Sequence, residues 1–240
     1  MMPLPNPQTV ELFTANSSLE GLKILHLSDL HIHQKMPLDC IDQLVEMCQS
    51  LEHDFIVITG DIIDCKPQYI TPHLRKLNTL KKVFYVSGNH DLFYGIKPLK
   101  ALLSNFTFLD NTHTFIEFNQ QTITLVGISD RFSRFFNIKR DEKKTLECLQ
   151  KYQNTILLAH QPKDYTLAVK THTPLFLCGH THGGQIFPFH YVVKWFQPFL
   201  AGSFYQQNTA IYVNKGLGTW GVHFRYKANS EMTLLKLITA

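Results

Sequence analysis

The stretch LFLCGHTHGGQIF, residues 175–187, begins as an apolar run and ends in a glycine-rich turn with two histidines. A short apolar run bounded by such a turn is typical of a buried strand. Residues i and i+2 of an extended chain point to the same side, so His180 and His182 can both reach one small bound group. Taken alone, two histidines at this spacing are more often structural than ligating. The rest of the chain must supply further ligands before the motif indicates a site.

The same pattern, a short apolar run that ends in small and polar residues, occurs five times along the chain. The runs are residues 22–31, 54–64, 82–91, 155–162 and 174–182. Between them lie segments whose apolar residues recur at helical spacing. We expect helices over residues 38–51, 72–80, 98–103, 141–152 and 164–169.

The second half of the chain also contains strands that are not separated by helices. Residues 114–128 alternate around a polar turn, which predicts a hairpin, and residues 210–218 and 232–239 predict two more strands. Strands interleaved with helices and then paired antiparallel indicate an α/β fold of two mixed sheets packed as a sandwich with helices outside. With 240 residues and 44% hydrophobic composition, residues 1–240 are expected to form one domain.

Composition excludes some function classes. The formal net charge is only +4, and no long Lys/Arg run appears, so nucleic acid is not an expected partner. The five cysteines form no CxxC pair, which is typical of small buried thiols in a reducing compartment. Residues 1–13 show neither a signal-peptide pattern nor a membrane-spanning run. We expect a soluble cytoplasmic protein, with peripheral contact at the inner membrane left open and the oligomeric state not predicted.

Each of the five apolar runs ends in Asp, Asn or His. In sheets with helical crossovers, such strand ends gather at one edge, where ligands bind. Buried Asp and His side chains are costly unless they are paired or bound to metal. The candidate ligands are Asp29, His31, Asp61, Asn89, His160, His180 and His182, and Asp64, His90 and Asp91 lie beside them.

The types of these residues indicate the metal chemistry. The set contains two Asp, one Asn and four His, with no Cys, which argues against a structural zinc site of the thiolate type. Imidazole and carboxylate ligands together suit manganese, iron or zinc. Seven ligands are too many for one ion but suit two ions that share a bridge, roughly 3.5 to 4 Å apart. The sequence therefore predicts a centre of two divalent metal ions.

Five blocks, SDLH, TGDIID, SGNHD, LLAHQP and CGHTHGG, resemble in order and spacing the signature of the calcineurin-like metallophosphoesterases. The resemblance implies a four-layer α/β/β/α sandwich. The motif GHTHGGQIFPF and the segment VNKGLGTWGVHFRYKANSEMTLLKL are similar to the bacterial branch of small phosphodiesterases. That branch includes enzymes that cleave the pyrophosphate of UDP-2,3-diacylglucosamine in lipid A synthesis.

The resemblance also implies a role for each candidate residue. One metal would be held by Asp29, His31 and His182, the other by Asn89, His160 and His180, and Asp61 would bridge the two. His90 would protonate the leaving oxygen, with Asp64 as the residue that orients it. Asp91 is the alternative to Asp64, and its structural interpretation is a helix or turn cap.

The activity that the resemblance implies is hydrolysis of phosphodiesters, with monoesters as an open possibility, by in-line attack of a hydroxide bridging the metals. Manganese is expected ahead of iron or zinc. Two alternatives are a UDP-2,3-diacylglucosamine pyrophosphatase and a non-catalytic scaffold of the same fold. The substrate is accordingly a small-molecule or lipid phosphoester or pyrophosphate.

Four positions near the motifs have no certain role. Cys65 stands where the protein phosphatase branch carries an arginine, which argues against phosphoserine and phosphothreonine proteins as main substrates. His33 is either a solvated turn histidine, which we favour, or a contact to the substrate phosphate. Arg131 and Arg134 are expected on a water-facing loop, with binding of a second phosphate as the alternative.

Residues 186–205 contain eight aromatic side chains. Such residues most often pack an insertion onto the rest of the fold, and we favour that interpretation. The alternative is an apolar lid or a membrane-facing rim beside the metals.

Overall fold

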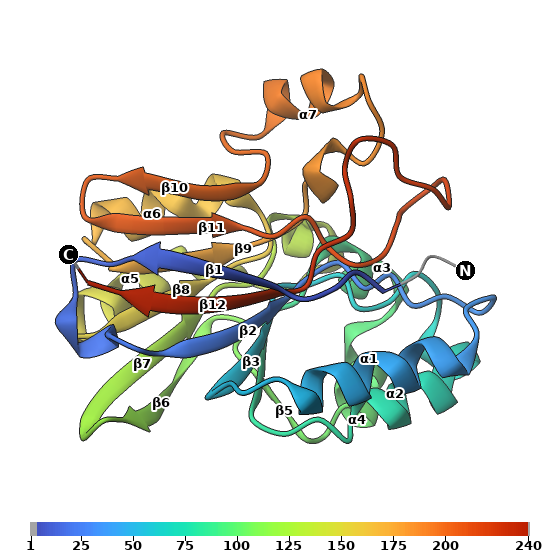
Figure 1. The fold of residues 1–240 in the computed structure, drawn as a ribbon, viewed down its shortest axis with the longest axis horizontal. Coiled ribbons are helices and arrows are strands. Elements are labelled where there is room, and N and C mark those ends of the chain that lie inside the picture. The colour runs from blue at the N-terminus through green and yellow to red at the C-terminus, as the bar shows by residue number, and fades with distance from the viewer. Residues whose placement is uncertain (1–3, 240) are drawn as a thin grey trace.

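The computed structural model describes residues 4–239, which form two six-stranded sheets packed face to face (Figure 1). The first sheet has the order β1-β12-β2-β3-β4-β5 and the second β10-β11-β9-β8-β7-β6. The strands of the first sheet are β1 (Gln8–Phe13), β2 (Lys23–Leu27), β3 (Phe55–Ile58), β4 (Val83–Tyr85), β5 (Phe106–Phe108) and β12 (Thr233–Ile238). Those of the second are β6 (Thr112–Phe118), β7 (Gln121–Gly127), β8 (Thr155–Leu158), β9 (Leu175–Cys178), β10 (Gly202–Gln206) and β11 (Thr209–Val213).

Both sheets are mixed, as the sequence predicted. In the first sheet β2 to β5 run parallel, and β12 is antiparallel to β2 and parallel to β1. In the second sheet β7, β8, β9 and β11 run parallel, and the edge strands β6 and β10 are antiparallel to their neighbours. The predicted hairpin is β6–β7, whose loop residues Asn119 and Gln120 have the positive φ angles that such a tight turn requires.

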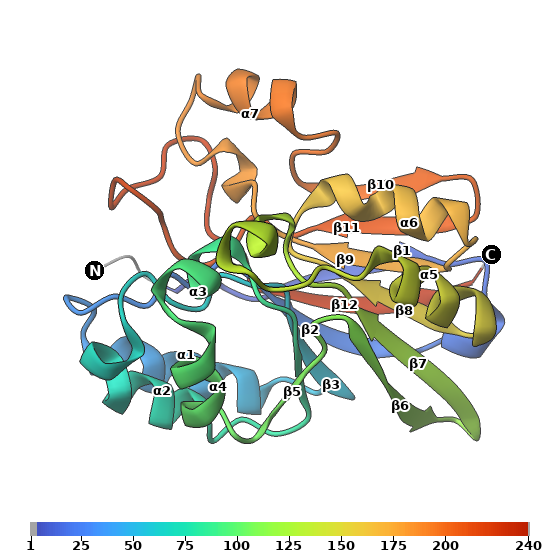
Figure 2. The same ribbon diagram turned by 180° about the vertical axis from the view of Figure 1, so that it is seen from behind.

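Helices cover the outer face of each sheet, which completes four layers (Figure 2). The first sheet is covered by α1 (Leu38–Ser50), α2 (Thr71–Leu77) and α4 (Ile96–Leu102), and the second by α5 (Glu142–Lys151) and α6 (Tyr165–Lys170). These match the five predicted helices. The sequence did not predict α3 (Asn89–Tyr94), α7 (His190–Phe196), β1, β5 or β10. Short 3-10 helices lie at Ser17–Leu19, Pro67–Ile70, Arg131–Phe136, Pro162–Asp164 and His182–Gly184.

The central strands β3 and β9 are apolar along their whole length, because both of their faces are buried. In β3, Phe55 and Val57 belong to the core between the sheets, whereas Ile56 and Ile58 pack in a second core with α1 and α2. A third core lies between the second sheet and its helices, with Leu157 and Phe176 at its centre. Each fully buried side chain of this size contributes roughly 1.5–3 kcal/mol, so three cores hold the strand ends firmly in place.

The aromatic segment 186–205 does not behave as predicted. Phe199 and Phe204 pack against the third core, but α7 stands away from the sheets and buries none of its residues (Figure 1). Trp195 is 88% exposed, and Tyr191 and Phe196 are also largely exposed. The prediction of packing is therefore wrong for α7, because none of its residues reaches any of the three cores found among residues 4–239.

Two further sequence expectations concern cysteines and membrane spans. Cys48 and Cys178 are buried as expected, whereas Cys40, Cys65 and Cys148 are only partly buried, and all five are free thiols. Within residues 4–239, no helix has the length and apolar character needed to cross a membrane.

Candidate metal centre

The seven predicted ligands lie together at the carboxyl ends of strands from both sheets. Asp29 and His31 follow β2, Asp61 follows β3, and Asn89 begins α3 just after β4. From the second sheet, His160 follows β8, and His180 and His182 follow β9. Because parallel strands end at the same edge of a sheet, the two packed sheets bring all of these side chains to one place.

Most of the predicted ligands have a strained backbone conformation. Five of the seven residues have left-handed φ angles between 46° and 72°: Asp29, His31, Asp61, His180 and His182. Each such angle costs a non-glycine residue about 1–3 kcal/mol and persists only where the surrounding structure enforces it. Here Asp29 N donates to Gly60 O and His31 N donates to Asp61 O, both at 3.0 Å. Strain of this kind is concentrated at functional sites.

Two glycines leave room for the carboxylates. A Cβ atom on Gly88 would lie 2.1 Å from Asp61 Oδ1, and one on Gly179 would lie 2.5 Å from Asp29 Oδ2. Any side chain at either position would therefore push a carboxylate out of place. This explains why glycine stands before the ligand in both SGNHD and CGHTH.

The first cluster consists of Asp29, His31 and His182. His31 Nε2 and His182 Nε2 lie 3.0 Å apart, and Asp29 Oδ1 lies 3.4 Å from His182 Nε2. All three side chains are almost completely buried.

The second cluster consists of Asp61, Asn89, His160 and His180. His160 Nε2 lies 3.1 Å from His180 Nδ1, 3.2 Å from Asn89 Oδ1 and 3.3 Å from Asp61 Oδ2. The same Asp61 oxygen lies 3.7 Å from His31 Nε2 in the first cluster. Asp61 Oδ2 is thus shared between the two groups.

These two clusters have the chemistry that divalent cations require. Asp29 Oδ1 is buried without a hydrogen-bond partner among the described residues, and imidazole nitrogens face each other in both clusters. Each cluster contains three His or Asp ligand atoms within 4.8 Å of one another. Buried carboxylates and imidazoles left in this arrangement are costly unless a cation is placed between them. The residues present therefore suit two divalent metal ions.

The protonation states also favour cations. Burial lowers the pKa of His180 and of His182 to about 4, so both imidazoles keep a free lone pair at neutral pH. Burial alone would raise the pKa of Asp29 and Asp61, but neighbouring histidines outweigh it and hold both carboxyl pKa values below the ordinary range. Burial opposes a proton on His160, yet the Asp61 carboxylate raises the pKa of His160 well above its usual value. The Asp61 carboxylate therefore attracts positive charge to the position of His160.

His90 lies at the edge of this centre. Its Nδ1 is 2.8 Å from Asp64 Oδ1, and its ring meets the edge of the His31 ring with centroids 4.7 Å apart. Burial lowers the pKa of His90, but the hydrogen bond that His90 donates to Asp64 and the charge of Asp61 together raise it above the ordinary histidine value. His90, Asp64 and His31 also form a third group of possible ligand atoms.

Asp91, the alternative partner of His90, faces the backbone instead. Its carboxylate accepts hydrogen bonds from Asp61 N at 2.7 Å, Gly88 N at 2.9 Å and Ile63 N at 3.2 Å, as well as from the Tyr85 hydroxyl. Burial, with the nearby Asp61 charge, raises the pKa of Asp91 to about 6. The geometry therefore favours the structural interpretation of Asp91.

The structure also shows the surroundings of the four positions that the sequence left without a role. Cys65 is partly buried against the first core, and the His33 ring lies 4.9 Å from the His223 ring. Arg131 lies on an exposed loop, as expected, but its charge is paired, because its Nε donates to the buried Asp164 at 2.8 Å. Arg134 lies over the Phe135 ring, 4.8 Å from its centroid.

The sequence reasoning missed Arg225, which reaches the centre from the far end of the chain. Its Nη2 lies 3.0 Å from His182 Nδ1, and its Nη1 donates to His182 O at 3.0 Å. The same guanidinium group donates to several backbone carbonyls, those of Lys215, Gly216, Gly218 and Ala228. The only sequence signal was a lone arginine within the matched segment VNKGLGTWGVHFRYKAN.

Replacing Arg225 with alanine is expected to weaken metal binding about 10- to 100-fold, because His182 loses the group that fixes its ring. Titration of divalent metal into the stripped protein measures this. Arg140→Ala is the matched control, since Arg140 makes similar buried contacts to Asp164 away from the centre. Unchanged metal affinity in Arg225→Ala would show that Arg225 only ties the loop together.

The family model for calcineurin-like phosphoesterases matches residues 22–199. The match covers all seven predicted ligands and most of the chain. This chain belongs to the calcineurin-like phosphoesterases.

Relatives within the calcineurin-like phosphoesterases occur in bacteria and animals. An uncharacterized metallophosphoesterase of Helicobacter pylori is 38% identical over 225 residues, which cover 90% of this chain and 60% of that protein. One from Bacillus subtilis is 31% identical, covering 91% of this chain and 79% of that protein. A transmembrane protein with a metallophosphoesterase domain from Danio rerio is 30% identical, covering 92% and 54%. The chain thus spans little more than half of some of these relatives.

Solved structures of nucleotidases share the fold. A putative 5'-nucleotidase of Staphylococcus aureus superposes with a TM-score of 0.58 at 12% identity, over 91% of this chain and 55% of that one. An NAD nucleotidase of Haemophilus influenzae gives a TM-score of 0.57 at 14% identity, over 82% and 50%. At these identities the likeness shows the fold of the two-sheet sandwich alone.

Proposed function

We propose that this chain is a phosphodiesterase that works with two divalent metal ions, and that residues 1–240 form one catalytic domain. The observation that carries the proposal is the position of Asp61 Oδ2, which is shared by two buried ligand groups. A carboxylate oxygen placed in this way is what a two-metal phosphoesterase requires.

The proposed ligands follow from the two clusters. One ion would be held by Asp29, His31 and His182, the other by Asn89, His160 and His180, and Asp61 would contribute to both sites. When bound there, the metals supply Lewis-acid stabilisation of the phosphoryl oxygens and activation of a nucleophile at neutral pH. The donor set of imidazole, carboxylate and amide groups is compatible with manganese, which we propose ahead of iron or zinc.

His90 is proposed as the acid that protonates the leaving oxygen. Its Nε2 is left for the substrate because Nδ1 is engaged by Asp64. The Asp64 carboxylate fixes the tautomer and favours the protonated ring, as the raised pKa of His90 indicates. Asp64 therefore acts as a positioning residue for His90.

The experiment compares three substrates with the manganese-loaded protein: bis-p-nitrophenyl phosphate, p-nitrophenyl phosphate and UDP-2,3-diacylglucosamine. We expect a higher kcat/KM for the diester than for the monoester, and loss of both activities after chelation. No turnover of any of the three would contradict the proposal and favour a non-catalytic scaffold.

A second candidate function is a pyrophosphatase that meets a lipid substrate at the inner, cytoplasmic surface of a membrane. It is favoured by two exposed aromatic segments, α7 and residues 218–227, which we together call the aromatic rim. The chain just before α7 is tied to the second segment, because Phe187 N donates to Tyr226 O at 3.0 Å and Gln185 Nε2 donates to Trp220 O at 2.9 Å. The rim exposes large apolar side chains: Tyr191, Trp195, Phe196, Trp220, Phe224 and Tyr226.

The charge of the aromatic rim also favours contact with a membrane surface. No Asp or Glu occurs from residue 165 to residue 230, whereas Lys194 and Lys227 lie among the exposed aromatics. Aromatic side chains with lysines and without acids are typical of a surface that rests on anionic lipid headgroups. Greater turnover of the lipid nucleotide than of both nitrophenyl esters would select this second candidate.

Replacing Trp195 and Phe196 together with alanine is expected to weaken binding to anionic liposomes roughly tenfold or more, because two exposed anchors are lost. Liposome co-sedimentation measures the effect. The matched control is the double substitution Phe13→Ala with Phe115→Ala, which removes exposed aromatics from β1 and β6. Equal liposome binding by all three proteins would contradict membrane contact through α7.

A further inference from the structure

A large cavity lies beside the metal centre, and residues of the aromatic rim between 218 and 225 form part of its lining. Its volume is about 850 Å³, and it is enclosed by the segment 4–8, by α1 with the turn before it, and by residues 217–225. One wall contains His31, the ligand of the first cluster, so the cavity begins where the metal centre ends. Its volume lies within the range of pockets that bind drug-sized molecules.

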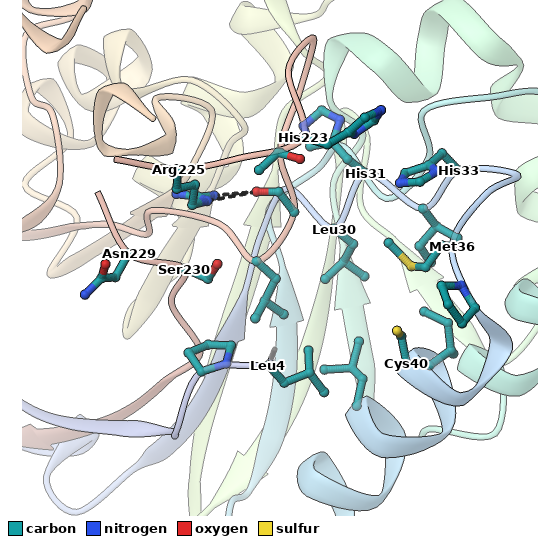
Figure 3. A pocket seen from close by; sticks show the side chains of 18 of the residues that line it. Leu4, Leu30, His31, His33, Met36, Cys40, His223, Arg225, Asn229 and Ser230 are labelled. Atoms are coloured by element: carbon teal, nitrogen blue, oxygen red, sulfur yellow. Dashed lines mark hydrogen bonds between the residues drawn. The ribbon is translucent and has the colours of Figure 1, made fainter. Parts of the chain in front are cut away.

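The two ends of the cavity differ in chemistry. His31, His33 and His223 gather at one end, and Leu4 and Cys40 lie at the other (Figure 3). Aliphatic side chains of the first core make up much of the lining: Leu30, Ile32, Ile41, Leu44 and Leu217. The uncharged polar residues Asn229 and Ser230 lie along one side of the cavity (Figure 3). The cavity therefore runs from a polar mouth at the metal centre to an apolar interior.

The charged residues around the cavity also indicate a polar mouth and an apolar interior. Among the described residues that line it, none is acidic, and the charged ones are Lys35 and Arg225. Since Arg225 is already engaged by His182 and several carbonyls, Lys35, two residues after His33, is the other cation of the lining. An anionic group is thus favoured at the mouth, and the interior favours an uncharged apolar group.

We infer that the cavity binds an aliphatic chain of an amphiphilic phosphoester whose phosphate lies at the metal centre. The inference rests on the proposed phosphoesterase activity and names the class of its substrate. A nucleobase is a poorer occupant, because bases bind between aromatic faces and the interior walls are aliphatic. The aromatic rings at the mouth, His33 and His223, already face each other.

The first test is a series of diesters that share one leaving group: methyl, butyl and octyl p-nitrophenyl phosphate. Each methylene that enters the cavity is expected to raise kcat/KM roughly threefold, so octyl should exceed methyl by about 10²-fold or more. Equal rates across the series would overturn the inference and leave the phosphodiesterase proposal intact. Absence of turnover even of the methyl ester would contradict the phosphodiesterase proposal itself.

A substitution tests the location of the chain. Figure 3 shows the Cys40 sulfur directed from α1 into the cavity, and Cys40→Trp places an indole there. The ratio of octyl to methyl turnover should fall to less than about tenfold in this variant. Cys148→Trp, on α5 and away from the cavity, is the matched control and should keep the wild-type ratio. An unchanged ratio in Cys40→Trp would place the chain elsewhere.

A third measurement needs neither turnover nor a variant. Iodoacetamide labelling of Cys40 and Cys148 in the wild-type chain is followed by peptide mass spectrometry, with octylphosphonate or methylphosphonate present. Octylphosphonate should slow labelling of Cys40 about tenfold without affecting Cys148, and methylphosphonate should protect neither. Equal labelling of Cys40 with both phosphonates would overturn the inference.

Discussion

Replacing Asp61 with asparagine is expected to reduce turnover on the order of 10³-fold and to lower the metal content from two ions per chain to one or none. The change removes a negative charge that two buried ligand groups share, through one oxygen 3.3 Å from His160 Nε2 and 3.7 Å from His31 Nε2. Breaking a buried ionic contact of this kind costs about 4 kcal/mol, and each 1.36 kcal/mol is a factor of ten in rate.

Asparagine has nearly the same shape as aspartate, so the variant should fold. Its Oδ1 can still accept the hydrogen bond from His90 N, which is 2.8 Å long in the wild type. Asp110→Asn is the matched control, because Asp110 also accepts from a strand-end backbone amide, Ser87 N at 2.9 Å, but stands outside both clusters. Two bound ions and near-normal turnover in Asp61→Asn would contradict the bridging role.

Replacing His90 with alanine is expected to reduce turnover about 10²- to 10⁴-fold while both metals stay bound. The loss should be larger for esters with an alkoxide leaving group than for nitrophenyl esters, because a nitrophenolate leaves more readily without a proton. Parallel rate measurements on the two ester types, with metal analysis of the same samples, provide the check. Loss of metal from His90→Ala would show that His90 is a ligand, and an equal loss for both ester types would exclude the acid role.

The pH dependence of wild-type turnover should also reflect the acid role of His90. The raised pKa of His90 means that the imidazole keeps its proton to a higher pH than an ordinary histidine. Activity that needs the protonated ring is therefore present at lower pH and is lost as pH rises through that pKa. Asp64→Asn removes the hydrogen-bonded charge that raises the pKa and should move this alkaline decline to lower pH.

The central part of this fold was predictable because the sequence carries it in local patterns. Strands such as β3 and β9 are short apolar runs between polar ends, and each ends in the side chains that the site uses. Once five such ends were expected at one sheet edge, the residue types predicted a centre of two divalent ions. The division of the ligands into two clusters came from the resemblance to the calcineurin-like metallophosphoesterases. The left-handed φ angles of Asp61 and His182 had no signal in the sequence beyond the neighbouring glycines.

The features that were missed depend on partners distant in the sequence. Arg225 is 43 residues from His182, and no local pattern shows which acceptors a lone arginine will reach. β1 is a strand because it pairs with β12 at the other end of the chain. The exposure of Trp195 was mispredicted for the same reason, since aromatic composition does not reveal whether a facing surface exists to cover it.

The most direct test of the two-metal centre is anomalous diffraction from crystals of the manganese-loaded protein. We predict two manganese peaks, roughly 3.5 to 4 Å apart, one beside His31 and His182 and the other beside His160 and His180, with Asp61 between them. A single peak, or a peak in the group formed by His31, Asp64 and His90, would contradict the account.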